Sequence, residues 1–419
     1  MFNFQSGLKS YADTTTRRAK NTIIESQRPM TEENNKAWWR WLWIPCGVAI
    51  AAGLAVGGAL FFIFETFAGR GIAVLIFMVA CLPASALFAF EKSWRRRFVP
   101  AALCVGMSLL LLISIVLSAP TGVPDSNSAI NQAFLRDTSF PRFSPFNILP
   151  EIDQYKLGFI VGPRLGMLQS RKEAKRLSEL FLPLYREMEQ RAEYRALGSV
   201  SRYTLAQLWG GTFDVGHVYH YVPPASASTG AQLPVIIALH GFGGNNKAYL
   251  YTWEKFGNRN TYIVLCPSFG FGFWGRGGSD AVERVRQYAI EKLNGDPDRI
   301  YLAGYSNGSL GVSRTIAVHP DHYAGAVFIS PAIDMSVLDS KQFLDAWGQR
   351  PILCVTGGAD ARISESGVSR NMETLKKSGL RCTYKIFTTE DHFLMFEPDG
   401  SCFAEIERWL KAQASSSAH

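Results

Sequence analysis

The sequence predicts a chain of two parts, a membrane-spanning N-terminal region followed by an α/β domain with a mostly parallel sheet. Three observations predict this fold class. Three long segments near the N-terminus contain no Asp, Glu, Lys or Arg, short apolar runs alternate with helical patterns after residue 202, and a glycine-flanked serine directly follows one of these runs. Continuous apolar strands that alternate with helices are typical of a parallel sheet covered on both faces.

The three uncharged segments are residues 41–64, 71–90 and 98–118. Each is near the length of about 20 residues that a helix needs to cross the hydrocarbon core of a bilayer. The first segment starts after a polar stretch, residues 1–40, so we do not expect a cleavable signal peptide. We therefore predict a polar tail at 1–40 and a three-helix transmembrane region at 41–118, retained in the mature protein. No charged side chain lies inside a span, so a transport role is not expected.

The distribution of basic residues predicts the orientation of these spans. The loop at 65–70 carries a single Arg, whereas basic residues precede the first span and fill the loop at 91–97 (Lys9, Arg17, Arg18, Lys20, Arg28, Lys36, Arg40; Lys92, Arg95, Arg96, Arg97). By the positive-inside rule, the N-terminus and the second loop are cytoplasmic and everything after residue 118 is extracytoplasmic. The net charge of +8 then mostly reflects the basic residues that orient the spans in the membrane. We therefore expect no nucleic-acid partner.

Gly53 and Gly57 form a small-xxx-small pattern inside the first span. This pattern lets a second helix approach closely and predicts possible helix–helix self-association. Glycine is also common in membrane spans for no such reason, and the pattern does not distinguish the two interpretations.

Residues 119–199 are predicted to connect the membrane region to the main domain. The stretch 119–150 is rich in Pro, Ser and Asn and is interpreted as a linker, whereas 170–197 has the apolar spacing of amphipathic helices, which Pro183 is predicted to divide. The helical stretch could be a lid, a helix on the membrane surface, or a helix packed against the main domain, and the packed helix is favoured.

The α/β domain is expected over residues 200–419. Apolar runs predict strands, and helical patterns lie between several of them (strands 217–222, 235–239, 261–266, 300–303, 323–329, 352–356, 382–387; helices 280–293, 307–318, 366–378, 403–412). In open parallel sheets ligands bind beyond the carboxyl ends of the strands. Candidate functional residues are therefore sought directly after each strand.

Gly304-Tyr305-Ser306-Asn307-Gly308 directly follows the strand at 300–303. A G-x-S-x-G sequence between a strand and a helix is the form of a nucleophile elbow. The flanking residues must be very small, because a bulky side chain would collide with the adjoining strand and helix. Ser306 is therefore the candidate nucleophile.

A nucleophilic serine needs a general base, an acid that orients the base, and donors for the developing oxyanion. His392 follows the strand at 382–387 and Asp360 follows the strand at 352–356, which gives the chain order serine, acid, histidine. Asp334, one strand earlier, is the alternative acid. The turn His240-Gly241-Phe242-Gly243-Gly244 predicts the backbone N–H groups of Phe242 and Asn307 as the oxyanion hole, with His240 in a structural role.

The stretch 270–275 has the spacing G-x-G-x-x-G after a strand, but its aromatic residues would crowd a pyrophosphate. We instead interpret Phe271, Phe273 and Trp274 as the wall of a substrate pocket. No metal or organic cofactor is expected. Cys382 and Cys402 could form a disulfide in an oxidising compartment, but their spacing does not establish one.

Residues 216–412 resemble the α/β-hydrolase superfamily. The segments HGFGGN at 240–245 and DRIYLAGYSNG at 298–308 are similar to polyhydroxybutyrate-depolymerase, feruloyl-esterase and dienelactone-hydrolase-like serine esterases. The resemblance implies hydrolysis of carboxylic esters through an acyl-enzyme, without a metal or cofactor. Ser309 departs from it, because many relatives carry glycine there, and its side chain could narrow the helix contact or the pocket.

The sequence thus predicts a membrane-anchored serine carboxylesterase-type hydrolase that acts on small or polymeric esters on the extracytoplasmic side. One alternative is a serine peptidase of prolyl-oligopeptidase type, because such peptidases share a similar layout. The other is a catalytically inactive hydrolase-fold binding protein tethered to the membrane.

Overall fold

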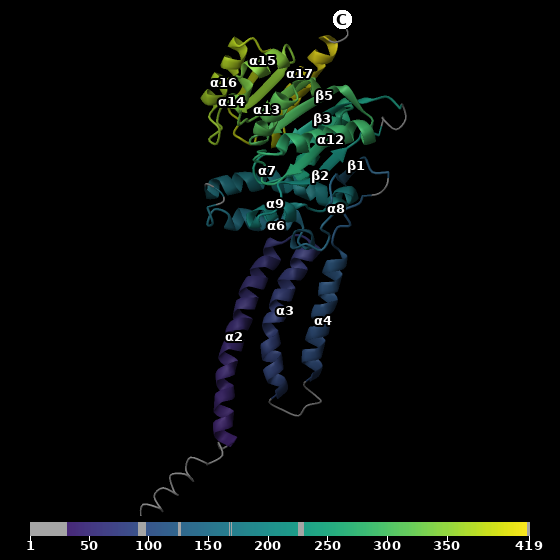
Figure 1. Cartoon of the computed structure of the whole chain (residues 1–419). Helices are drawn as coiled ribbons and strands as arrows, with labels where there is room; N and C mark the ends of the chain where they lie inside the picture. Colours follow the sequence, from purple (N-terminus) through teal and green to yellow (C-terminus); the bar gives the residue numbers. More distant parts are fainter. Residues whose placement is uncertain are drawn as a thin grey trace, which may run out of the picture. The chain divides into compact units, whose positions relative to one another are not determined.

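Apolar helices and a sheet-forming region separate into two units. The computed structural model describes residues 32–90, 98–124, 127–166, 168, 170–224 and 230–416 (Figure 1). One unit comprises Met1–Phe62 and Arg70–Ile113, and the other comprises Ile63–Gly69 and Ser114–His419. The short segment between the first two long helices therefore belongs to the sheet-containing unit.

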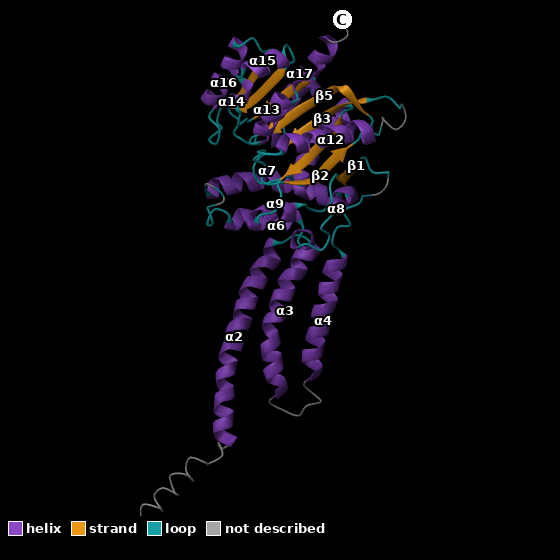
Figure 2. Ribbon diagram, in the orientation of Figure 1, coloured by secondary structure: helices purple, strands orange, loops and turns teal. Residues whose placement is uncertain are grey.

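Within the described residues, the first unit contains most of the helices α2 Glu32–Ile63, α3 Phe67–Phe90 and α4 Phe98–Leu117 (Figure 2). The stretches Trp41–Ile63 and Phe67–Ser85 are long and apolar enough to cross a membrane, with mean hydropathies of 2.2 and 2.0. The apolar part of α4, Ala101–Leu117, is shorter. Length and composition thus support two candidate spans, and the third span stays a prediction. The basic residues of 1–31 and 91–97, on which most of the orientation rests, lie outside the described residues.

Gly53 and Gly57 of α2 face α3 of the same chain. A Cβ atom at Gly53 would lie 2.4 Å from the Cβ of Ala80, and one at Gly57 would lie 2.7 Å from the carbonyl oxygen of Ala73. The close helix approach expected of this pattern is therefore made within the chain. Because α3 covers this face, the structure does not support its predicted use in self-association.

The second unit contains an eight-stranded sheet with the order β1-β2-β4-β3-β5-β6-β7-β8. Strands β3 to β8 pair in parallel with one another, whereas β2 pairs antiparallel with β4, and the edge strand β1 pairs antiparallel with β2. Strands β2 to β8 cover the apolar runs from which strands were predicted, with shifts at their ends, whereas β1 was not predicted (β1 Ile130–Phe134, β2 Asp214–Tyr221, β3 Leu233–Leu239, β4 Ile263–Phe269, β5 Gly295–Tyr305, β6 Gly325–Ile329, β7 Ile352–Gly357, β8 Cys382–Phe387).

Apolar side chains alternate between the two faces of this sheet. On β3, Ile236 and Ala238 face one core with α11 Lys247–Asn260 and α17 Ser401–Ser416. Val235, Ile237 and Leu239 face the other core. The helices on that side include α12 Gly278–Leu293, α13 Gly308–Val318, α15 Lys341–Trp347 and α16 Glu365–Lys377. Burial on both faces is what holds a parallel sheet together.

The first sheet strand differs from the linker that was predicted over 119–150. β1 pairs antiparallel with β2, with Ile130 opposite Tyr221 and Phe134 opposite His217. Gln132 fixes the strand further, because its amide nitrogen donates to the carbonyl oxygens of Gly122 at 2.6 Å and Leu197 at 3.0 Å. The segment was missed because β1 is an edge strand in which only Ile130 is buried, so its sequence lacks a clear apolar pattern.

Helices from the same connecting region complete one core (α5 Pro145–Ile148, α6 Glu151–Val161, α7 Arg171–Gln190, α8 Ala192–Leu197, α9 Ser201–Ala206). The prediction that Pro183 divides the helical stretch was wrong, since α7 continues through it. Leu180 on one side of the proline, and Tyr185 and Met188 on the other, are buried in the core. This packing offsets the lost backbone hydrogen bond. The favoured interpretation of α7 as a packed helix agrees with its burial.

All seven cysteines are free thiols. Cys382 packs against the core that contains Val235 and Ile237, whereas Cys402 belongs to the core on the opposite face of the sheet. Because the sheet separates the two thiols, the Cys382–Cys402 disulfide does not form.

Candidate active site

Ser306 lies on the sharp turn between β5, which ends at Tyr305, and α13, which begins at Gly308. Its φ angle of 53° is in the left-handed region, which is unfavourable for a residue with a side chain. The Ser306 N–H donates to the carbonyl oxygen of Ile329 at 2.9 Å, and this bond to β6 helps to hold the turn. The strained turn presents the hydroxyl above the end of the strand.

The two glycines of the elbow are required by space. A Cβ atom at Gly304 would lie 2.6 Å from the carbonyl carbon of Gly308, and one at Gly308 would lie 2.1 Å from the carbonyl oxygen of Leu239. Such contacts are too close for any side chain. The crowding is with backbone atoms, so neighbouring side chains could not relieve it.

Ser309, the departure from the resemblance, is accommodated inside the elbow. Its side chain is buried, and its hydroxyl donates to the carbonyl oxygen of Gly304 at 2.9 Å. The extra side chain therefore bonds the first turn of α13 back to β5. It does not occupy a substrate pocket.

The structure brings Ser306, His392 and Asp360 together. His392 Nε2 lies 3.0 Å from Ser306 Oγ, and His392 Nδ1 lies 2.7 Å from Asp360 Oδ2. All three residues are buried, with exposed fractions of 9%, 6% and 7%. When Nδ1–H donates to the carboxylate, Nε2 is left as the acceptor of the serine proton.

Asp360 is held as an ionised acceptor. Burial alone raises the pKa of its carboxyl, but the hydrogen bond and attraction of His392 outweigh burial and lower the pKa below 3.8. The N–H groups of Arg362 and Ile363 also donate to Asp360 Oδ1, at 2.8 and 2.9 Å. The carboxylate can therefore fix the imidazole tautomer.

Asp334, the alternative acid, has other partners. Its Oδ2 accepts from Arg314 Nε at 2.9 Å, and its Oδ1 accepts from the hydroxyl of Ser336 at 2.5 Å. It stands just before a short helix, α14 Met335–Leu338. The carboxylate that is hydrogen-bonded to His392 is therefore that of Asp360 and not that of Asp334.

The glycine turn after β3 approaches the serine closely. A Cβ atom at Gly241 would lie 3.1 Å from the Cβ of Ser306. Within the described residues, neither the N–H of Phe242 nor that of Asn307 has a hydrogen-bond acceptor. Asn307 precedes the first residue of α13, where helix N–H groups lack partners in the helix. Both predicted donors thus remain available for an oxyanion.

His240 has the structural role expected of it. Its Nδ1–H donates to the carbonyl oxygen of Gly241 at 2.8 Å, and its Nε2 accepts from the N–H of Phe269 at 3.1 Å. Burial lowers the pKa of His240 to about 4, so the ring is neutral at pH 7. The neutral ring joins the glycine turn to β4.

The aromatic residues predicted for the pocket occupy two environments. The rings of Phe271 and Phe273 lie 6.0 and 5.5 Å from the ring of Phe242, which is 66% exposed. Trp274 instead is fully buried, stacks on Phe269, and donates from Nε1 to the carbonyl oxygen of His240. Trp274 is thus a core residue, which corrects its predicted place in the pocket wall. The side chain of Phe242 was not predicted to join this aromatic group.

Helix α7 contacts the loops that carry the acid and the base. Arg176 pairs with Glu397 and lies 3.6 Å from the carboxylate of Asp391, the residue before His392. Glu173 pairs with Arg362, two residues after Asp360. These contacts could not be predicted from the sequence, because the partners are far apart in the chain and opposite charges alone do not identify a pair.

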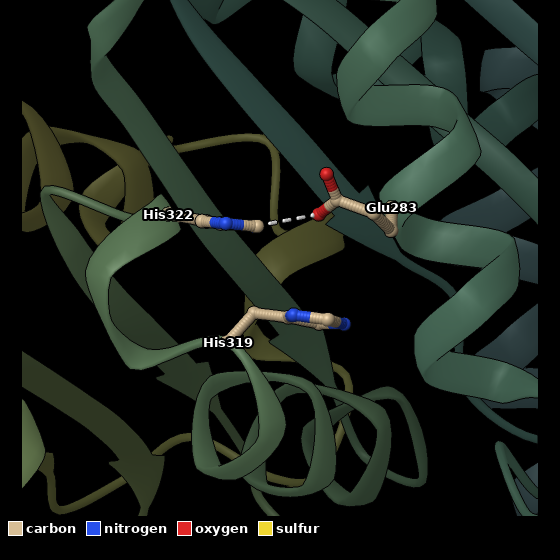
Figure 3. A group of neighbouring side chains, drawn as sticks. All are labelled: Glu283, His319 and His322. Atoms are coloured by element: carbon tan, nitrogen blue, oxygen red, sulfur yellow. Dashed lines mark hydrogen bonds and ion pairs between the residues drawn. The ribbon is translucent and has the colours of Figure 1, made fainter.

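One group outside this site has the side chains that could hold a metal ion. Glu283 on α12, His319 at the end of α13 and His322 in the following turn have one potential ligand atom each within 4.8 Å of the others (Figure 3). His322 Nδ1 lies 3.0 Å from Glu283 Oε2, and the two imidazole rings are stacked with an angle of 6°. Because a ring nitrogen binds a metal in the plane of its ring, one ring would have to rotate before both could share an ion.

Comparisons with known proteins point to serine esterases. No protein-family model matches the chain. Poly(3-hydroxyalkanoate) depolymerase C of Paucimonas lemoignei is 28% identical over 153 residues, which are 32% of this chain and 36% of the depolymerase. Feruloyl esterase B of Thermothelomyces thermophilus is 30% identical over 128 residues, 26% of this chain and 43% of that enzyme. Among solved structures, Est1E from Butyrivibrio proteoclasticus has 16% identity and a TM-score of 0.39, covering 48% of this chain and 94% of Est1E.

The chain spans less than half the length of these two curated relatives. The similarity, the mostly parallel sheet and the strand-turn-serine-helix arrangement agree with the α/β-hydrolase resemblance of the sequence. The chain is thus similar to α/β-hydrolase serine esterases of the depolymerase and feruloyl-esterase kind.

Proposed function

We propose that the protein is a membrane-anchored serine hydrolase that cleaves carboxylic esters. The observation that carries this proposal is the pair of hydrogen-bond distances at His392, 3.0 Å to Ser306 Oγ and 2.7 Å to Asp360 Oδ2. The esterase activities of the similar proteins support an ester as the substrate class. The size and identity of the ester depend on pocket shape rather than on the fold.

In the proposed reaction, Ser306 Oγ attacks the ester carbonyl carbon while His392 Nε2 takes the hydroxyl proton. Asp360 stabilises the imidazolium that forms, and the N–H groups of Phe242 and Asn307 donate to the oxyanion. His392 then protonates the leaving alcohol, which leaves an acyl-enzyme on Ser306. A water molecule, deprotonated by His392, attacks the acyl carbon and releases the acid and the free serine.

We further propose that α2, α3 and α4 anchor the enzyme and that the hydrolase domain is extracytoplasmic. Two apolar helices of sufficient length support anchoring. The excess of Lys and Arg before the first span and in the 91–97 loop supports the orientation. The domain organisation that follows is a tail at 1–40, a membrane region at 41–118, connecting helices at 119–199 and the catalytic region at 200–419.

The nucleophile is tested with a fluorophosphonate probe, which reacts covalently with activated serines. We expect the full-length protein to be labelled and Ser306→Ala to lose labelling completely. Ser378→Ala is the matched control, because Ser378 is exposed and contacts only Asp339 through its hydroxyl. Labelling of Ser306→Ala at the level of the control would refute the assignment.

The same probe in a membrane-impermeant form tests the orientation. Intact cells should show labelling equal to that of permeabilised cells. Labelling that appears only after permeabilisation would place the domain on the cytoplasmic side. Comparing the turnover of p-nitrophenyl esters with that of the corresponding anilides would then separate an esterase from a peptidase. The absence of both turnover and labelling would indicate a binding protein.

A further inference from the structure

A cavity away from the Ser306 site lies within the sheet-containing unit. Its volume is about 210 Å³. Its wall comes from the start of α3, the residues after α4, the α5–α6 junction, several residues between 189 and 199, and the start of α11. A water molecule occupies about 30 Å³ in the liquid, so a small polar group of several heavy atoms fits. None of the residues assigned to catalysis lines this cavity.

A buried carboxyl group without a partner lines the cavity. Glu151, the first residue of α6, is 3% exposed, and both of its carboxylate oxygens lack a hydrogen-bond partner among the described residues. Burial raises the pKa of Glu151 above 4.5, although the positive charge of Lys247 acts in the opposite direction. A buried acceptor left without a donor costs roughly 1–3 kcal/mol, and more if charged. A ligand that donates hydrogen bonds would remove this cost.

Two cationic side chains line the same cavity. Lys247 is 3% exposed, its Nζ donates to the carbonyl oxygen of Tyr194 at 3.3 Å, and it lies 3.9 Å from Glu189 Oε1. Arg195 uses one guanidinium nitrogen to donate to the carbonyl oxygen of Glu189 at 2.7 Å. Lysine has three donors and arginine five, so both retain donors for an anionic group. The cavity thus offers an acceptor for a cation and donors for an anion.

Part of the wall comes from residues at the ends of the apolar helices. Thr66 and Phe67 stand where α2 gives way to α3, and Ser118 directly follows α4. The buried carboxylate of Asp153 fixes this segment, because it accepts from the Glu65 N–H at 2.6 Å and from the Thr66 hydroxyl at 2.5 Å. If these helices span the bilayer, the chain itself puts this wall at the depth of the lipid headgroups.

We propose that this cavity binds the headgroup of phosphatidylethanolamine, with the ammonium on Glu151 and the phosphate on Lys247 and Arg195. The ammonium of this lipid has three N–H donors for the unpartnered carboxylate, whereas the quaternary ammonium of phosphatidylcholine has none. Phe67 and Phe146 supply an apolar surface for the part of the lipid next to the headgroup. This inference rests on the membrane anchoring in the proposed function, but it does not depend on the Ser306 reaction.

The test uses the full-length protein in nanodiscs that contain phosphatidylcholine with either phosphatidylethanolamine or phosphatidylglycerol. Lipid retained by the protein is measured by native mass spectrometry after release from the nanodisc. We expect preferential retention of phosphatidylethanolamine, reduced about tenfold in Glu151→Gln, a loss of roughly 1.4 kcal/mol of binding free energy. Lys247→Met should reduce retention as well. Glu179→Gln, a substitution of the same kind at an exposed position on α7, should retain the lipid fully.

Several results would overturn the inference. Equal retention of all three lipids, or unchanged retention in Glu151→Gln, would show that the buried carboxyl does not recognise an ammonium. Binding of soluble glycerophosphoethanolamine without retention of the lipid would assign the cavity to a soluble ligand. Fluorophosphonate labelling of the same samples checks folding, because Glu151→Gln and Lys247→Met should be labelled like the unmodified protein. The same measurement separates failure of this inference from failure of the proposed catalysis.

Discussion

At the scale of single residues, the catalytic arrangement depends on contacts that leave almost no alternative at each position. Ser306 adopts a strained φ of 53°, and the glycines on either side face backbone atoms at 2.6 and 2.1 Å. The sequence predicted this turn because few other sequences can form it. The partner of His392 was less certain from sequence, since both Asp334 and Asp360 follow strands and only the folded loops show which one faces the imidazole.

The acid is tested by separate Asp360→Asn and Asp334→Asn substitutions. An amide at 360 can hold the imidazole in the wrong tautomer, so we expect kcat to fall about 10⁴-fold, as for the equivalent change in a serine protease. Asp334→Asn loses a partly exposed ion pair with Arg314, and we expect less than a threefold change in kcat. Steady-state kinetics on a p-nitrophenyl ester measures both, and a larger loss at Asp334 would contradict the assignment.

At the scale of elements, helix α7 of the 119–199 region contacts the loops that carry Asp360 and His392. Its buried face packs into the core with Leu180 and Tyr185, while Glu173 and Arg176 pair with residues beside Asp360 and His392. The helical periodicity of this stretch was visible in the sequence. The proline inside it misled the prediction, because local propensity favours a break and only tertiary packing shows that the helix continues.

Arg176 is expected to act as a positioning residue for the His392 loop. In Arg176→Gln the pairs with Asp391 and Glu397 are lost, and we expect kcat to fall three- to tenfold with KM unchanged, since a partly exposed ion pair contributes about 1 kcal/mol. Lys175→Gln, which removes only an exposed pair with Glu179, should leave both constants unchanged. A change confined to KM would show that Arg176 contacts the substrate instead.

At the scale of the whole molecule, the sheet-containing unit includes more of the chain than the sequence suggested. Apolar strands, the elbow and the order of serine, acid and histidine were predictable because each depends on local sequence. The edge strand β1, the segment Ile63–Gly69 and the cavity at Glu151 were not, because each depends on residues far apart in the chain. Their sequences have no periodicity or motif that marks them.

Three buried histidines predict acid lability of this unit. Burial lowers the pKa of His217 to about 3 and the pKa of His220 and His240 to about 4, whereas the ordinary value is 6.5. Between these values the unfolded chain binds more protons than the folded protein, so stability is full above pH 6.5 and falls as the pH decreases toward 4. Each histidine contributes a slope of about 1.4 kcal/mol per pH unit.

Thermal unfolding of the detergent-solubilised protein at several pH values measures this slope. We expect Tm to decrease steadily below pH 6.5 and to decrease less steeply in His220→Gln. His220 is the suitable site because its Nδ1 has no hydrogen-bond partner among the described residues. A Tm that is independent of pH between 6.5 and 4, or an equal slope in the variant, would contradict the prediction.

The bonds from Asp153 to residues 65 and 66 also bear on how the catalytic part could be produced without its apolar helices. A fragment that starts at residue 200 would expose the edge of β2 and the part of one core that the connecting helices cover, so we expect it to aggregate. A fragment that starts at residue 114 keeps β1 and the connecting helices but leaves the buried Asp153 carboxylate without the donors of Glu65 and Thr66. Joining residues 63–69 to residue 114 through a flexible spacer would restore these donors, and this design is the shortest one expected to give a monodisperse soluble enzyme.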